Sequence, residues 1–381
     1  MGSNGLGKAA GGAGLAAAAI ASLLALSGCG ESKPLRAPCP AGKLCLEYGN
    51  GSEPVSLDPH KITGTWESRV VGELLMGLTQ EDPEGRPVPG MATSWRTSPD
   101  GLVWTFHLRD AKWSDGEPVT ADDFVFSLRR LLSPALASEY ASLMYVIKNA
   151  QPVNEGKLPL TALGVRAIDP RTLEITLEHP APYLPELAKH QTMIPVPRHV
   201  VEKWGDDWSK PAHFVSNGPY RLEEWRFGDH VRLGRNPLFY DAGKVCFDQV
   251  TFYPTADAVS AERRVRRGEL DLNAEIQSNR IAFLRQPDQI PDYVRVHTYL
   301  GVNYLAFNTH DVPAFKDRRV RIALDMAIDR DFITQKLLRG GQQSAYGFVP
   351  PGVANYVSPP PPVWASWSLE RRHRAARALL A

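Results

Sequence analysis

The chain has 381 residues, of which 43% are hydrophobic and 22% charged. This is an ordinary globular composition, and the length predicts two or three folding units rather than a disordered chain. The formal net charge is +1 and no long basic run occurs, so nucleic-acid binding is excluded.

The N-terminus predicts an export signal. A short segment with one lysine, Lys8, precedes a run of small and apolar residues over 15–26. As a helix this run would rise about 18 Å, which is too short for a hydrocarbon core of roughly 30 Å. The run ends at Leu26-Ser27-Gly28-Cys29, which resembles a bacterial lipobox. We therefore expect a lipoprotein signal peptide over 1–28 and lipidation of Cys29; an ordinary signal peptide with a coincidental cysteine is the alternative.

Two glycine-rich matches to nucleotide-binding motifs occur within 2–17. Both lie inside the leader and neither follows a strand, so we dismiss them. Residues 29–39 then read as a tether.

Three other cysteines, Cys39, Cys45 and Cys246, would enter an oxidising compartment. Cys39 and Cys45 flank Pro40 and Gly42, which favours a short disulfide loop between them. Pairing of Cys246 with one of the two is the alternative, and the sequence leaves it open. No second Cys or His pair has a spacing suited to zinc, and no metal site is expected.

Helical and strand patterns alternate along the chain. Apolar residues at helical spacing predict a helix over 66–78, and alternation predicts half-buried strands over 103–108 and 172–178. Thr120 and Asp123 resemble a capping box that opens a helix. The remaining expectations are strands over 44–48, 250–253 and 270–272, helices capped by Asp317 and Asp329, and a helix over 368–381. The class is α/β or α+β.

Catalytic signatures are missing from the sequence. It contains no Gly-x-Ser-x-Gly elbow and no His-Glu-x-x-His zinc helix. The acidic pair 122–123 opens a helix, and the pair 206–207 lies in a loop-like stretch. We therefore expect neither pair to act as a general acid and base. We expect no catalytic residue and no cofactor. The residues alone therefore predict an exported binding protein that is not an enzyme.

Longer motifs carry a family resemblance. The run from Ala111 to Phe124 (AKWSDGEPVTADDF) is the most specific, and others follow the same order along the chain: 53–60 (EPVSLDPH), 104–109 (WTFHLR), 217–220 (NGPY) and 327–330 (AIDR). From about residue 44 to its last residue, the chain resembles the oligopeptide-binding members of the family 5 extracellular solute-binding proteins.

The resemblance implies an α/β, three-lobed fold like that of periplasmic binding proteins (type II, cluster C). Lobe I would comprise 40–75 and 198–300, lobe II 76–197, and the start of lobe III 301–381. Relatives continue past this chain's end, so we expect a truncated third lobe, poor ligand binding and a tendency to aggregate.

The resemblance also implies a function. The protein would capture oligopeptides between lobes I and III and deliver them to the permease subunits of an ABC transporter. It would be a monomer in the periplasm or cell envelope, held at the membrane by its lipid anchor alone. The ligand contacts carried over from the family are Thr65, Tyr140, His190, Glu275 and Tyr304. At Glu275 the best-matching relatives have Asn, so the resemblance implies a different pocket chemistry there.

Three alternatives stay open. The same fold could bind another solute, such as a β-glucoside or a nickel chelate. The chain could be a truncated remnant that binds nothing. An exported hydrolase is the most distant alternative, since no nucleophile constellation supports it.

Overall fold

The computed structural model describes residues 36, 38–297, 299–353 and 355–381. The expected signal peptide, Cys29 and most of the tether lie outside these residues. The chain divides into two compact units, 1–274 and 275–381, so the division precedes the expected boundary between 300 and 301. In the described ranges no helix is long and apolar enough to cross a membrane.

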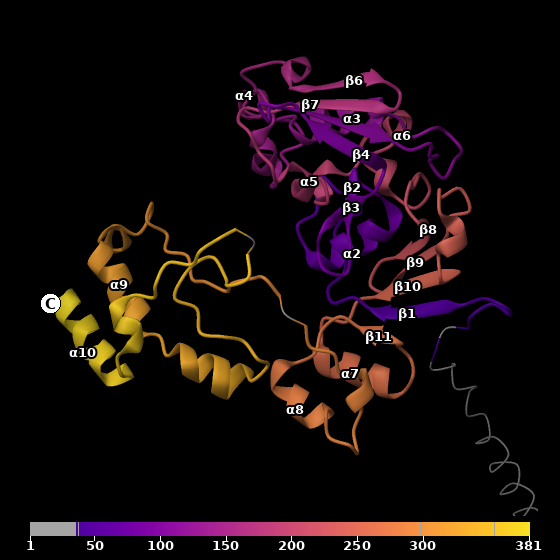
Figure 1. Ribbon diagram of the computed structural model, residues 1–381. Helices are drawn as coiled ribbons and strands as arrows, with labels where there is room; N and C mark the ends of the chain where they lie inside the picture. The colour runs from indigo at the N-terminus through magenta and orange to yellow at the C-terminus, as the bar shows by residue number, and fades with distance from the viewer. Residues whose placement is uncertain (1–35, 37, 298, 354) are drawn as a thin grey trace, which may run out of the picture. The chain divides into compact units, whose positions relative to one another are not determined.

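The strands of the N-terminal unit form three sheets (Figure 1). The first has the order β11-β1-β10-β9-β8, the second pairs β2 with β3, and the third has the order β4-β5-β7-β6. Their bounds are β1 Cys45–Gly49, β2 Thr79–Glu81, β3 Pro87–Pro89, β4 Ala92–Thr97, β5 Val103–Leu108, β6 Val165–Asp169, β7 Thr172–Thr176, β8 Tyr220–Arg226, β9 His230–Arg235, β10 Gln249–Tyr253 and β11 Leu272–Asn273.

The α-helices of this unit are α2 Thr65–Leu74, α3 Ala121–Leu131, α4 Ala150–Asn154, α5 Leu184–Leu187, α6 Arg198–Trp204 and α7 Ala258–Arg266. The C-terminal unit contains α8 Ile281–Leu284, α9 Arg318–Ala327, a π-helix over Phe332–Leu338 and α10 Leu369–Leu380.

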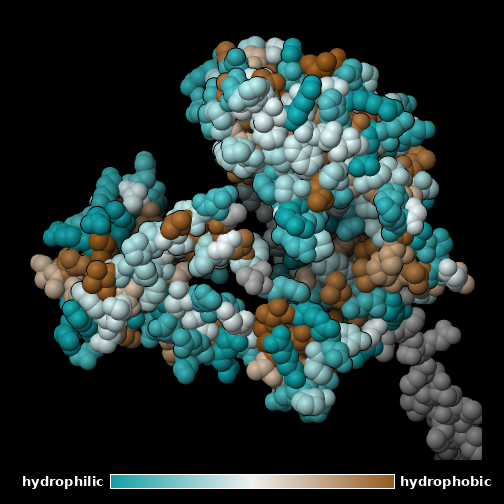
Figure 2. All heavy atoms as spheres, in the orientation of Figure 1, coloured by the Kyte–Doolittle hydropathy of each residue, from teal (hydrophilic) through white to brown (hydrophobic). Residues whose placement is uncertain are grey.

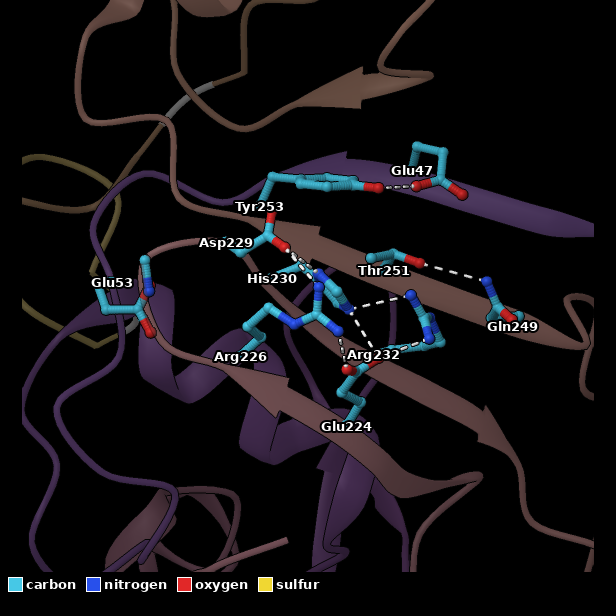
Figure 3. A network of polar contacts seen from close by, with 11 residues as sticks. Glu47, Glu53, Glu224, Arg226, Asp229, His230, Arg232, Gln249, Thr251 and Tyr253 are labelled. Atoms are coloured by element: carbon cyan, nitrogen blue, oxygen red, sulfur yellow. Dashed lines mark hydrogen bonds and ion pairs between the residues drawn. The ribbon is translucent and has the colours of Figure 1, made fainter. Parts of the chain in front are cut away.

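The five-stranded sheet combines segments far apart in sequence. Strand β1 pairs in parallel with β10 and β11, while β9 and β8 continue antiparallel. One face is apolar and joins the core through Leu233, Val250 and Phe252. Because side chains alternate along a strand, the opposite face is polar. Register places Glu47, Thr251, Arg232 and Glu224 in one row across it (Figure 3).

The polar row is internally paired. Arg232 donates to Glu224 at 2.7 Å, and the Tyr253 hydroxyl donates to Glu47 at 2.6 Å. Burial and the contact with Glu47 together raise the pKa of Tyr253. Glu47 and Thr251 are each 1% exposed, so this polar row is buried at its centre. On the face of the molecule that Figure 2 shows, the surface of this unit is mostly hydrophilic, with hydrophobic residues scattered among the polar ones.

The four-stranded sheet follows the sequence pattern closely. Phe106 of β5 pairs with Leu173 of β7, and both side chains are buried on the face that α3 covers. The predicted helix start is confirmed, because the Asp123 carboxylate accepts a hydrogen bond from the Thr120 backbone N–H at 2.8 Å.

The helix predicted over 66–78 is shorter than expected. It ends at Leu74, and Leu75 is already extended. The Asn217 side chain explains this end, since it accepts from the Met76 N–H at 2.9 Å and donates to the Met76 carbonyl at 3.0 Å. A distant side chain thus replaces the helical hydrogen bonds that Met76 would otherwise make.

The two predicted caps in the C-terminal unit are confirmed. Asp317 accepts from the Arg319 N–H at 2.8 Å, and Asp329 accepts from the Phe332 N–H at 3.0 Å. Helices α9 and α10 pack on each other through Ala323, Met326 and Ala376.

A disulfide joins Cys39 to Cys45, with the Cα atoms 5.8 Å apart. Among the described residues Cys246 is a free, exposed cysteine. The bond fixes the chain just before β1 begins.

Candidate functional site

A pocket with a volume of about 310 Å³ opens in the N-terminal unit, at the small end of the range for ligand pockets. Its lining comes from α2 and the residue Thr63 before it, from the turn at 140 and from the segment 189–194. The lining residues are Thr63, Thr65, Ser68, Val71, Gly72, Tyr140, Lys189, His190, Gln191 and Ile194.

The first wall is the N-terminus of α2, and a buried carboxylate shapes it. Glu67 accepts hydrogen bonds from the backbone N–H groups of Gly64 at 2.9 Å and Thr63 at 3.3 Å, and from Val55 at 2.9 Å. The bond from Gly64 satisfies the N–H of the residue that caps the helix, and the other two hold the preceding segments against α2. Gly64 stays extended, and the flanking Thr63 and Thr65 are exposed at the pocket.

The second wall is aromatic. The rings of Tyr140 and His190 meet edge to face, with centroids 5.3 Å apart at 86°. His190 Nδ1 accepts from the Thr192 backbone N–H at 3.3 Å. Burial lowers the pKa of His190, so the imidazole is neutral at pH 7 and carries its proton on Nε2.

Gln191 connects the two walls. Its amide accepts a hydrogen bond from the Ser68 hydroxyl on α2 and donates to the Ile62 carbonyl at 2.6 Å. Gln191 is 8% exposed, so both groups of its side chain amide are satisfied inside the protein. This link sets the spacing between α2 and the segment 189–194.

A buried ion pair supports the same region. Arg130 donates to both carboxylate oxygens of Asp58, at 3.1 and 2.5 Å, and Asp58 is 2% exposed. Burial alone would raise the pKa of Asp58, but the hydrogen bonds and charge of Arg130 outweigh it and the pKa is lowered.

His60 connects this ion pair to the pocket. Its Nδ1 lies 3.0 Å from Arg130 Nη1, and its Nε2 lies 3.1 Å from the carbonyl of Ile194, a lining residue. Arg130 can only donate, so Nδ1 is the acceptor and Nε2 carries the proton. Burial lowers the pKa of His60 to about 4, and His60 is therefore neutral at pH 7.

The structure assembles three of the five expected ligand contacts. Thr65, Tyr140 and His190 line the pocket, although they are widely separated in sequence. Glu275 and Tyr304 belong to the C-terminal unit. Tyr304 is 63% exposed there and packs edge to face on Phe348.

Sequence reasoning missed several lining residues. Gly72 had a local signal, because a glycine inside a helical period is unusual without a reason. Ser68 and Gln191 had no local signal in the sequence, because only the folded structure brings these two residues into contact. Nothing in the local pattern around them distinguishes them from ordinary surface or core residues.

The pocket offers hydrogen-bonding groups and aromatic surface. Ser68, Thr63 and Thr65 supply hydroxyls, and Tyr140 and His190 supply ring faces and edges. Within the described ranges no group of three or more His, Cys, Asp or Glu side chains could hold a metal ion. The arrangement suits non-covalent capture of a neutral group.

Comparison with known proteins identifies the family. The model described as "Bacterial extracellular solute-binding proteins, family 5 Middle" matches residues 86–381. The chain belongs to family 5 of the bacterial extracellular solute-binding proteins. The resemblance drawn from the motifs is thereby confirmed.

Individual family 5 relatives agree with this assignment. The chain is 42% identical, over 375 residues, to the periplasmic oligopeptide-binding protein OppA of Escherichia coli strain K12, covering 96% of this chain and 67% of that protein. The solved structure of Burkholderia pseudomallei OppA matches with a TM-score of 0.84 at 36% identity, covering 89% of this chain and 67% of that one.

A third relative was solved with a ligand. Haemophilus influenzae OppA in complex with RPPGFSPFR matches with a TM-score of 0.81 at 36% identity, covering 89% of this chain and 66% of that one. These likenesses confirm the expected α/β periplasmic-binding-protein fold. The chain spans about two thirds of the length of these family 5 proteins.

Proposed function

We propose that this family 5 protein is the substrate-binding component of a peptide ABC importer and that it captures oligopeptides. The observation that carries the proposal is the pocket that brings Thr65, Tyr140 and His190 together. Support comes from the three OppA relatives described above: the Escherichia coli protein is named as oligopeptide-binding, and the Haemophilus influenzae protein was solved with a nine-residue peptide.

The pocket chemistry fits a peptide. A broad-specificity peptide binder pairs with the ligand backbone and receives side chains in separate pockets. Gly64 is buried and its N–H is bonded to Glu67, but the flanking Thr63 and Thr65 are exposed and can contact a ligand backbone. The aromatic wall suits one ligand side chain. Glu275 and Tyr304 are further proposed ligand contacts, contributed by the C-terminal unit.

Photolabelling of the full chain tests this proposal, because a covalent adduct also records the weak binding that the sequence predicts. A tripeptide carrying benzoylphenylalanine should label α2 and the segment 189–194, and excess Ala-Phe-Ala should suppress the labelling. Mass spectrometry of the digest locates the adducts. Adducts elsewhere, or suppression by disaccharides and not by peptides, would contradict peptide capture.

We expect Tyr140→Ala to weaken binding of an aromatic tripeptide about 10-fold, because the ligand loses a ring contact worth on the order of 1.4 kcal/mol. Tyr183 provides a matched control, since it is 46% exposed and lies outside the pocket lining. Competition with the photolabel gives both affinities. Equal losses in Tyr140→Ala and Tyr183→Ala would argue against the pocket.

The proposal includes export to the periplasm or cell envelope, an anchor on Cys29, a monomeric state and a permease partner. We expect Cys29→Ala to abolish incorporation of a clickable fatty acid in cells and to leave an unprocessed precursor. Gel fluorescence and intact-mass measurement give the two readouts. Cys246→Ala is the control and should label like the natural chain; labelling that survives Cys29→Ala would refute the anchor.

A further inference from the structure

Gly72 is an unusual residue in the pocket wall. It lies inside α2, where glycine is less favourable than alanine. Its φ is not positive, so the backbone does not require glycine. A Cβ built at Gly72 would meet no heavy atom within 4 Å among the described residues beyond its own stretch of helix.

Two other glycines of this unit have a packing reason. A Cβ at Gly218 would lie 2.7 Å from the Leu74 carbonyl carbon, and one at Gly77 would lie 2.9 Å from the Ala188 oxygen. The fold therefore explains Gly218 and Gly77. It does not explain Gly72, whose missing side chain leaves open space at the pocket.

The residues around this open space indicate which chemical class of ligand group fits there. Val71 and Ile194 supply apolar surface, and Tyr140 supplies a ring. The lining includes no Asp or Glu, and its one lysine, Lys189, is paired with Glu186 at 2.8 Å. A cationic ligand group would find no carboxylate in this lining, whereas a bulky neutral ring would find apolar and aromatic contacts.

We propose that Gly72 is a specificity-determining residue that keeps this pocket open for a bulky, uncharged aromatic side chain of the bound peptide. The inference rests on the proposed function. It goes further by assigning the ligand group and the residue that admits it.

Substitutions at Gly72 test the inference in the full chain. Gly72→Leu should weaken binding of tripeptides with one tryptophan by about 10-fold, while Ala-Ala-Ala changes less than about 3-fold, because only a bulky group competes with the new side chain. Tryptophan is placed at each of the three positions in turn. Competition with the photolabelled tripeptide gives the affinities.

Two further variants separate pocket blockage from misfolding. Gly72→Ala should raise the melting temperature, since it removes the helix penalty without a clash. Gly243→Leu is the matched control, because Gly243 is also in open space and lies outside the pocket lining, and it should leave both peptide affinities unchanged.

The outcomes distinguish this inference from the proposed function. If the natural chain binds no tripeptide, the proposed function fails and the role of Gly72 falls with it. If the natural chain binds but Gly72→Leu keeps the same preference for tryptophan, only the inference is overturned. A lower melting temperature for Gly72→Ala would likewise overturn it, since the glycine would then be a packing requirement.

Discussion

Replacing Arg130 with methionine should lower the free energy of unfolding by about 3–5 kcal/mol. The substitution leaves the Asp58 carboxyl group, which is 2% exposed in the natural chain, without the guanidinium that now donates to both of its oxygens. The remaining donors to Asp58 are the His60 backbone N–H at 3.0 Å and Trp208 Nε1 at 3.3 Å. Neither carries a positive charge, so the buried carboxylate stays uncompensated.

Urea denaturation of each variant measures this loss. Arg166→Met is the matched control, since Arg166 pairs with Glu174 at 2.6 Å but its side chain is 68% exposed. An exposed pair is screened by solvent and contributes little to stability. The double variant Asp58→Asn with Arg130→Met should recover part of the loss, because it removes the unpaired charge. Similar small losses for Arg130→Met and Arg166→Met would contradict the buried-charge argument.

Lowering the pH from 7 to 4 should remove about 3 kcal/mol of stability through His60 alone. Burial lowers the pKa of His60 from 6.5 to about 4 in the folded protein. Between these values the unfolded chain binds a proton at His60 and the folded chain does not. Stability from this group is therefore present above pH 6.5 and is lost as the pH falls toward 4.

The comparison with His60→Gln isolates this effect. Glutamine can still donate to the Ile194 carbonyl but cannot be protonated, so its unfolding free energy should fall less steeply between pH 7 and 4. The exposed His179 gives the control variant His179→Gln, whose pH profile should follow that of the natural chain. Denaturation midpoints at pH 7, 6, 5 and 4 supply the profiles. Parallel profiles for His60→Gln and the natural chain would refute the linkage.

Local patterns in the sequence determined much of the secondary structure. Alternation over 172–178 became β7, in which Leu173 and Ile175 are buried, and Asp317 caps α9 as its position predicts. These features depend on residues within one turn of helix or one strand, so they can be predicted from the sequence without knowledge of the fold. The family motifs added the expected fold class, and the comparisons confirmed it.

Tertiary structure decided the features that depend on residues distant in sequence. The end of α2 is set by Asn217, which is 141 positions from Met76. The link between Ser68 and Gln191 and the pair of Asp58 with Arg130 span 123 and 72 positions. No periodicity relates such residues, because a hydrogen bond constrains distance in space and not along the chain. Among these contacts the Ser68–Gln191 link joins the two walls of the pocket, which only folding brings together.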